Sequence, residues 1–131
     1  MLDSLSYDYS IDSTRIYATG MSNGGFMSFL LSCQLSEKIA TIASVTGSMT
    51  PETFNNSNPQ HPTPILQIHG TSDNTVPYNG TTWSKSIDDV IQYWVDYNIY
   101  PNPTNSYIII ESNFSEPLDY ELLIIVIRLF Y

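Results

Sequence analysis

The chain has 131 residues, 42% hydrophobic and 13% charged, which suits one folded domain over residues 1–131 and excludes a disordered chain. Thirteen acidic side chains against four basic ones give a net charge of −9, which argues against nucleic acid and anionic membranes as partners. The single cysteine, Cys33, excludes an internal disulfide and a thiolate zinc cluster, and we expect it to be a small buried residue on a helix.

The first half of the chain alternates between strand and helix patterns. Residues 1–10 have neither the cationic start nor the apolar core of a signal peptide. Residues 15–19 predict a short strand that Gly20 ends, and the crowded apolar side chains of residues 24–35 favour a helix buried on most sides. Residues 39–45 predict a second strand. Three prolines and several amide side chains within residues 50–63 then predict a surface loop.

The second half continues the alternation and then changes character. Residues 64–70 predict a buried strand ended by glycine, and residues 83–98 have apolar side chains at helical spacing. Residues 107–111 and 122–129 are candidate strands, and the second is too short, and interrupted by Arg128, to cross a membrane. The alternating order predicts an α/β fold, with a mainly parallel sheet and flanking helices.

The pentapeptide Gly20-Met21-Ser22-Asn23-Gly24 fits the pattern G-x-S-x-G between a predicted strand and a predicted helix. A strand that turns directly into a helix strains the middle residue, and we expect glycines at the two flanking positions because side chains there would collide with backbone. Ser22 is therefore a candidate nucleophile, and the Asn23 N–H at the helix start can donate to an oxyanion. The alternative is a purely structural turn.

A serine nucleophile needs a histidine base and a carboxylate that orients the base. Asp73 follows the predicted strand over residues 64–70, where catalytic groups of open parallel sheets gather, and it lies after Ser22 in the chain as the order Ser, Asp, His requires. The alternative for Asp73 is a turn-forming residue that caps the backbone at Thr75 or Val76.

Two longer stretches carry a family resemblance. IDSTRIYATGMSNGGFMS, residues 11–28, and PTPILQIHGTSDNTVPYNG, residues 62–80, resemble the signature regions of polyhydroxybutyrate depolymerase-like and feruloyl or acetylxylan esterase-like α/β-hydrolases. The resemblance runs from about residue 7 to residue 98. It implies Ser22 as nucleophile, Asp73 as triad acid, and an exported enzyme that cleaves esters of hydroxyacids, acetate or aromatic acids, often in polymers.

The chain departs from this family in three places. The family's histidine follows the aspartate in a glycine-rich stretch, whereas both histidines here, His61 and His69, precede Asp73. We expect His69 to form a hydrogen bond with loop backbone near Asp73, and the alternative is that His69 is the catalytic base. We expect His61 to lie in a flexible loop. The strands that precede the nucleophile in the family are absent, and residues 104–131 form a divergent tail. We therefore expect a partial α/β-hydrolase domain that arose by truncation, frameshift or fragmentation.

Two functions of different classes remain open. The first is a serine esterase without metal or cofactor, acting on an ester substrate that can be polymeric, in which Tyr78 and Trp83 line the acyl site or instead pack against a helix start. The second is a non-catalytic fragment that binds esters or associates with other chains. A truncated sheet exposes its edges, so either function predicts a homo-oligomer that covers them, and a partner chain could supply the missing histidine.

Overall fold

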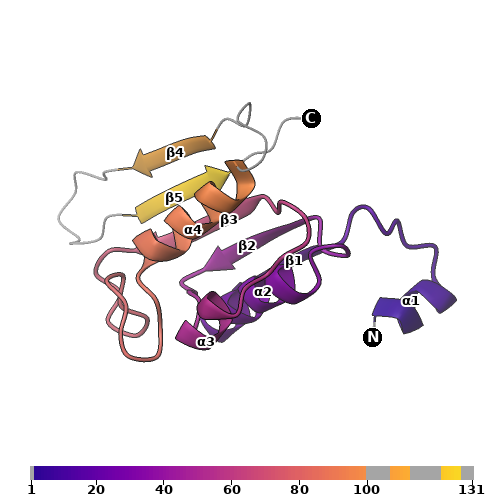
Figure 1. Cartoon of the computed structure of the whole chain (residues 1–131), viewed down its shortest axis with the longest axis horizontal. Helices are drawn as coiled ribbons and strands as arrows, with labels where there is room; N and C mark the ends of the chain where they lie inside the picture. The colour runs from indigo at the N-terminus through magenta and orange to yellow at the C-terminus, as the bar shows by residue number, and fades with distance from the viewer. Residues whose placement is uncertain (1, 100–106, 113–121, 128–131) are drawn as a thin grey trace.

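The computed structural model describes residues 2–99, 107–112 and 122–127 and contains one five-stranded sheet in the order β1-β2-β3-β5-β4 (Figure 1). The strands are β1 Tyr17–Met21, β2 Thr41–Val45, β3 Ile65–Gly70, β4 Tyr107–Ser112 and β5 Leu122–Ile127. The helices are α1 Leu2–Asp8, α2 Asn23–Gln34, α3 Pro51–Asn55 and α4 Ile87–Ile99.

The first three strands are parallel, as the alternating pattern predicted. Tyr17 pairs with Thr41 and Ile42 pairs with Ile65, so the carboxyl ends of β1, β2 and β3 meet at one edge of the sheet. β5 and β4 are strands as predicted, but β5 pairs with β3 and β4 pairs with β5, both in antiparallel orientation. Only residues 113–121 separate these two strands in the sequence, and a parallel pair needs a longer crossover, usually with a helix.

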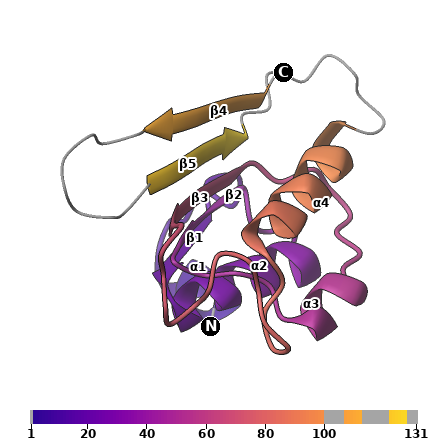
Figure 2. The ribbon, with the colours of Figure 1, turned by 90° about the vertical axis from the view of Figure 1, so that its left-hand side faces the viewer.

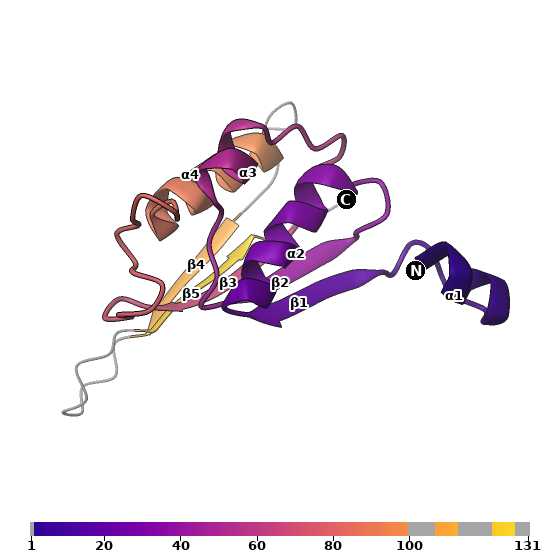
Figure 3. The same cartoon turned by 90° about the horizontal axis from the view of Figure 1, so that it is seen from below.

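Helices α2, α3 and α4 lie on the same side of the sheet, as two perpendicular views show (Figures 2 and 3). Alternate residues of β2 and β3 are buried under this layer, which is the pattern of a sheet face packed on a core. Phe29 of α2 and Trp94 of α4 stack with ring centroids 6.4 Å apart and are fully buried over Ile42 and Ile65. Cys33 is buried on α2, as predicted.

Three local predictions were wrong or incomplete. Residues 50–63 contain the short helix α3, because Thr50 accepts a hydrogen bond from the Thr53 N–H and a proline occupies the first turn. The helix expected from residue 83 begins at Ile87, because residues 81–86 form a turn and the Ser86 hydroxyl accepts from the Asp89 N–H at the actual helix start. Helix α1 was not predicted.

The edge at β1 has no neighbouring strand within the described residues, and it leaves large side chains in solvent. Tyr17 is 61% exposed and Met21 is 71% exposed. Helix α1 lies beyond this edge, apart from the helical layer (Figure 1), and buries none of its own residues. No helix in the described part of the chain is long and apolar enough to span a membrane. The rest of the divergent tail, residues 104–106, 113–121 and 128–131, lies outside the described residues.

Candidate active site

The turn between β1 and α2 strains the backbone at Ser22. Its φ of 53° and ψ of −117° lie in a region that residues with a side chain rarely occupy. Hydrogen bonds hold the residue there, because the Ser22 N–H donates to the Val45 carbonyl at 2.8 Å and the Ser22 carbonyl accepts from the Gly25 N–H at 2.8 Å. The strain expected at the middle residue of the pentapeptide is therefore present.

The glycines around Ser22 differ in what they permit. A Cβ on Gly20 would lie 2.5 Å from the backbone carbon of Gly24, so position 20 has no room for a side chain. A Cβ on Gly24 would meet nothing within 4 Å, so the predicted collision at position 24 was wrong. The neighbouring Gly25 is the position at which a side chain would clash, because a Cβ on Gly25 would lie 2.9 Å from the Gly47 Cα.

Ser22 lines a hollow of about 240 Å³ whose wall is mainly apolar. Its Oγ has no hydrogen-bond partner among the described residues, and neither does the N–H of Asn23, the first residue of α2. Phe26 and Trp83 form one side of the hollow, with ring centroids 6.0 Å apart. The remaining lining residues come from the loops after β2 and β3: Thr50, Thr75 and Val76.

The carboxylate of Asp73 is bound by its own loop, which follows β3. Its Oδ1 accepts hydrogen bonds from the Thr75 N–H at 2.8 Å and the Val76 N–H at 2.9 Å, as the turn-capping alternative described. The Asp73 side chain is 16% exposed to solvent. Since Thr75 and Val76 also line the hollow, the loop brings Asp73 next to the Ser22 hollow and leaves Oδ2 outside these two hydrogen bonds.

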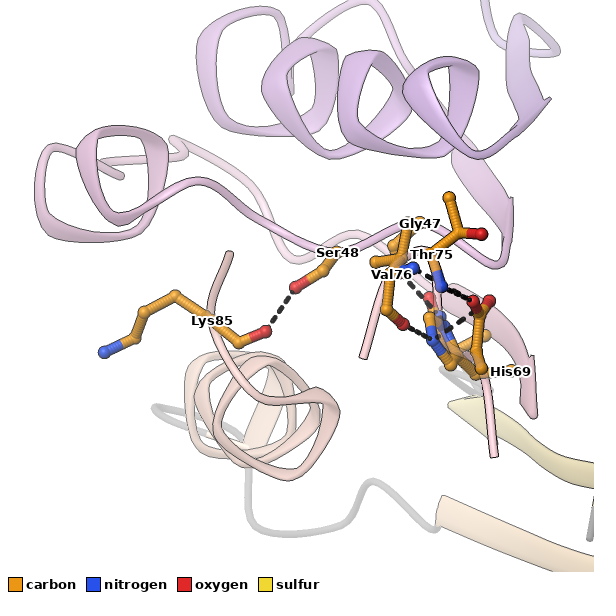
Figure 4. A network of polar contacts seen from close by, with 8 residues as sticks. Gly47, Ser48, His69, Thr75, Val76 and Lys85 are labelled. Atoms are coloured by element: carbon orange, nitrogen blue, oxygen red, sulfur yellow. Dashed lines mark hydrogen bonds and ion pairs between the residues drawn. The ribbon is translucent and has the colours of Figure 1, made fainter. Parts of the chain in front are cut away.

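His69 is fully buried behind this loop and does not line the hollow (Figure 4). Its Nε2 lies 2.8 Å from the Val76 carbonyl oxygen and its Nδ1 lies 3.2 Å from Gln67 Nε2. Both ring nitrogens are therefore occupied, and the structure does not bring His69 to Ser22. The contact with Val76 matches the expected bond to loop backbone near Asp73.

His61 lies at the other end of α2 from Ser22. Its N–H is 3.4 Å from the Ser36 hydroxyl oxygen, two residues past the end of α2 at Gln34. Twelve helical residues separate that end from Ser22, which corresponds to about 18 Å. Neither histidine of the chain reaches the serine.

Tyr78 and Trp83 have different surroundings. Tyr78 packs against the core, its hydroxyl donates to Asp88 Oδ1 at 2.7 Å, and its ring meets His69 edge-on. Trp83 is 49% exposed and faces the hollow beside Phe26. Thr81 supports Trp83, because its hydroxyl accepts from the Trp83 N–H.

Several residues near the site were not anticipated in that role from the sequence. Phe26, Thr50, Thr75 and Val76 line the hollow, and Gln67 contacts His69 from the same buried face of β3. The polar Gln67 within an apolar strand was the available signal, because a buried amide needs partners. Among the described residues, no group of three or more His, Cys, Asp or Glu side chains is placed to hold a metal ion.

Comparison with known proteins gives a consistent result. A family model described as phospholipase/carboxylesterase matches residues 4–109. The bifunctional acetylxylan esterase/xylanase XynS20E of Neocallimastix patriciarum is 36% identical over 78 residues, which cover 60% of this chain and 11% of that protein. Feruloyl esterase B of Piromyces equi is 43% identical over 72 residues, which cover 53% of this chain and 13% of that protein. The chain thus spans a small part of the length of these relatives.

Proposed function

Because the chain belongs to the phospholipase/carboxylesterase family of α/β-hydrolases, we propose that it is a serine esterase that hydrolyses carboxylic esters at Ser22. One observation carries the proposal: Ser22 occupies a strained turn at the start of α2, with its hydroxyl at an open hollow. A turn of this kind presents the hydroxyl above the sheet and puts a helix N-terminus directly behind it.

The proposed reaction is acyl transfer through a covalent intermediate. Ser22 Oγ attacks the ester carbonyl while a base takes its proton, and the Asn23 N–H donates to the oxyanion that forms. The intermediate collapses by expelling the alcohol, which takes the proton from the base, and leaves the acyl group on Ser22. Water then releases the carboxylic acid by the same two steps. Asp73 is the proposed triad acid: its Oδ1 is held by two loop N–H groups, and its Oδ2, 3.8 Å from His69 Nε2, is the oxygen proposed to orient the base.

The hollow supports a compact acyl group with apolar or aromatic character. Phe26, Val76 and Trp83 supply the apolar surface, and the half-exposed Trp83 ring is the proposed contact for the substrate. Acetyl and feruloyl esters, including those of polymers, are the proposed substrates by similarity to the acetylxylan and feruloyl esterases, and the resemblance of the two signature stretches adds hydroxyacyl esters. The same similarity supports an extracellular setting.

A second function is supported by the positions of the histidines. His69 is buried with both ring nitrogens bonded and His61 lies at the far end of α2. Loss of the base removes most of the rate of a serine hydrolase and leaves what binding and the oxyanion site contribute. The alternative is therefore a module that binds esters in the Ser22 hollow without turning them over.

The effect of added imidazole on the rate of ester hydrolysis distinguishes the esterase from the binding module. We expect hydrolysis of a short-chain p-nitrophenyl ester by the wild-type chain to rise with imidazole concentration, because free imidazole can replace a base that the chain lacks. Ser22→Ala removes the nucleophile and reports the background reaction of imidazole with the ester, and Ser10→Ala, in the exposed segment before β1, is the matched control. Equal rates for the wild type and Ser22→Ala at every imidazole concentration would contradict the esterase and favour the binding module.

We also propose that the chain self-associates through the β1 edge. Tyr17 and Met21 are exposed on this strand, and an unpaired strand edge is a template for another strand. Light scattering coupled to size-exclusion chromatography should give a mass above 14.8 kDa, and a proline at Thr19 should lower it. A monomer at all concentrations would contradict this proposal.

A further inference from the structure

Two buried polar residues behind the Ser22 hollow have no role in the proposed reaction. Gln67 and His69 lie two residues apart on β3, and both belong to the buried face of the strand. Gln67 is 1% exposed and His69 is 0% exposed. Buried polar groups cost free energy unless they are hydrogen-bonded, so their contacts identify what they do.

The contacts of Gln67 settle which way its amide points. Gln67 Nε2 lies 2.9 Å from the carbonyl oxygen of Gly47, which can only accept a hydrogen bond. The reversed amide would put two acceptors against each other at this position, so Nε2 is the atom that donates there. The same Nε2 lies 3.2 Å from His69 Nδ1. Nδ1 must therefore be the acceptor and carry no proton.

The other ring nitrogen has the opposite requirement. His69 Nε2 lies 2.8 Å from the Val76 carbonyl oxygen, another group that only accepts. Nε2 must therefore carry the proton. Two backbone carbonyls, one at each end of the pair, assign His69 to the neutral tautomer with its proton on Nε2.

Val76 is the point at which this pair meets the acid loop, residues 73–76. Its carbonyl is held by His69, its N–H is held by Asp73 Oδ1, and its side chain lines the Ser22 hollow. Asp73 Oδ2 lies 3.8 Å from His69 Nε2, which is beyond hydrogen-bonding distance. The imidazole thus acts on the carboxylate through Val76.

The far end of the pair reaches the helix that follows the nucleophile. Gly47, the acceptor of the Gln67 amide, packs directly on Gly25 in the first turn of α2, where neither glycine has room for a Cβ. A continuous set of contacts therefore runs from the helix behind Ser22 through Gly47, Gln67 and His69 to Val76.

We propose that Gln67 and His69 are a positioning pair: Gln67 keeps the proton of His69 on Nε2, and His69 uses it to hold Val76 and with it the carboxylate of Asp73. This assignment deepens the proposed function, on which the role of Asp73 rests. His69 is a positioning residue in this scheme. It cannot serve as the base while its only acceptor nitrogen is occupied by Gln67.

The tautomer is tested by NMR and needs no activity. A long-range ¹H–¹⁵N spectrum should show a pyrrole-type nitrogen at Nε2 and a pyridine-type nitrogen at Nδ1, and His61→Asn removes the only other set of histidine signals. Gln67→Glu replaces the donor by an acceptor and should put a proton on Nδ1. Gln34→Glu, the same change at an exposed position of α2, should leave the spectrum of His69 unchanged. A wild-type Nδ1 that carries a proton, or an unchanged tautomer in Gln67→Glu, would overturn the proposal.

The hold on the acid loop is tested by amide exchange. His69→Leu removes the donor, and we expect the Val76 amide to exchange at least about tenfold faster, whereas His69→Gln keeps an N–H at the end of the side chain and should restore slow exchange. The imidazole-supported, Ser22-dependent rate should fall in His69→Leu through kcat with KM unchanged. Equal exchange in the wild type and His69→Leu would refute the hold. Should His69→Leu not fold, the wild-type and Gln67→Glu spectra still decide, and an inactive wild type would count against the esterase alone.

Discussion

The two loops that flank the Ser22 hollow stabilise their functional residues in opposite ways. The nucleophile turn holds Ser22 at a φ of 53° and leaves its hydroxyl without a partner among the described residues. The acid loop holds Asp73 with two backbone N–H donors and ties Val76 to a buried imidazole. Strain is concentrated on one side and hydrogen bonding on the other, so relief of the strain at Ser22 should raise the free energy of unfolding, whereas loss of the Asp73 acceptor should lower it.

The largest effect is expected at the glycine that makes the strained turn possible. Gly20→Ala puts a Cβ 2.5 Å from the backbone of Gly24, and because neither backbone can yield easily we expect a loss of about 3 kcal/mol in the free energy of unfolding. Gly24→Ala is the matched control, because its Cβ enters open space and alanine favours a helix by about 0.5–1 kcal/mol. Urea titrations followed by circular dichroism measure both, and equal midpoints would show that the turn is less crowded than this geometry requires.

The acid loop should lose stability when its acceptor is removed. Asp73→Ala leaves the N–H groups of Thr75 and Val76 without their partner, and we expect a loss of about 1–2 kcal/mol. Asp73→Asn keeps an acceptor oxygen at the same place and should cost less than about 0.5 kcal/mol while it abolishes the proposed orientation of the base. Similar losses for the two variants would mean that the charge of Asp73, and not its acceptor geometry, holds the loop.

The nucleophile turn should gain stability when its strain is relieved. Ser22→Gly gives the residue a backbone conformation that glycine tolerates, and we expect it to be about 1 kcal/mol more stable than Ser22→Ala, which keeps the strain. Both variants lack the hydroxyl, so the comparison isolates the backbone. Ser22→Gly at or below the stability of Ser22→Ala would indicate that the turn is relaxed and would remove the contrast between the two loops.

The sequence was most informative where a residue type has one local cause. The strand, turn and helix around Ser22 followed from apolar spacing and from glycines beside a serine, and the residue type of Asp73 suggested the capping of residue 75 or 76 as the alternative to a catalytic role. The antiparallel addition of β5 depends on pairing with β3 at a distance in the chain. No local pattern carries that information.

The arrangement around the hollow was less predictable for the same reason. Gln67 and Val76 act through contacts with Gly47 and His69 that exist only after the sheet and loops have packed. The requirement for glycine at position 25 likewise comes from Gly47 on a separate loop. The residue type of Gln67 indicated that its buried amide needs hydrogen-bond partners, and tertiary packing determines that these are Gly47 and His69.

The smallest expected effect is a change of stability at alkaline pH, and it tests whether the contrast between strain at Ser22 and hydrogen bonding at Asp73 is confined to these two loops. Burial raises the pKa of Cys33 above its ordinary value of 9.0 and the pKa of Tyr93 above 10.0, and both contact Ser57, away from the Ser22 hollow. Unfolding lowers these pKa values, so the unfolded chain releases its protons first and the folded chain loses stability as the pH rises above about 9.

The difference in stability between Ser22→Gly and Asp73→Ala should stay constant over that pH range, because separated sites contribute additively. Tyr93→Phe, introduced into each of these two variants, removes one of the groups that titrate and should reduce the alkaline loss of stability without changing that difference. Urea midpoints measured across the range for the two variants, with and without Tyr93→Phe, decide the matter. If the difference in stability between Ser22→Gly and Asp73→Ala changed with pH, the helical layer around Tyr93 would be energetically coupled to the two loops. The contrast between the strained turn and the hydrogen-bonded acid loop would then depend on the whole sheet and its helices.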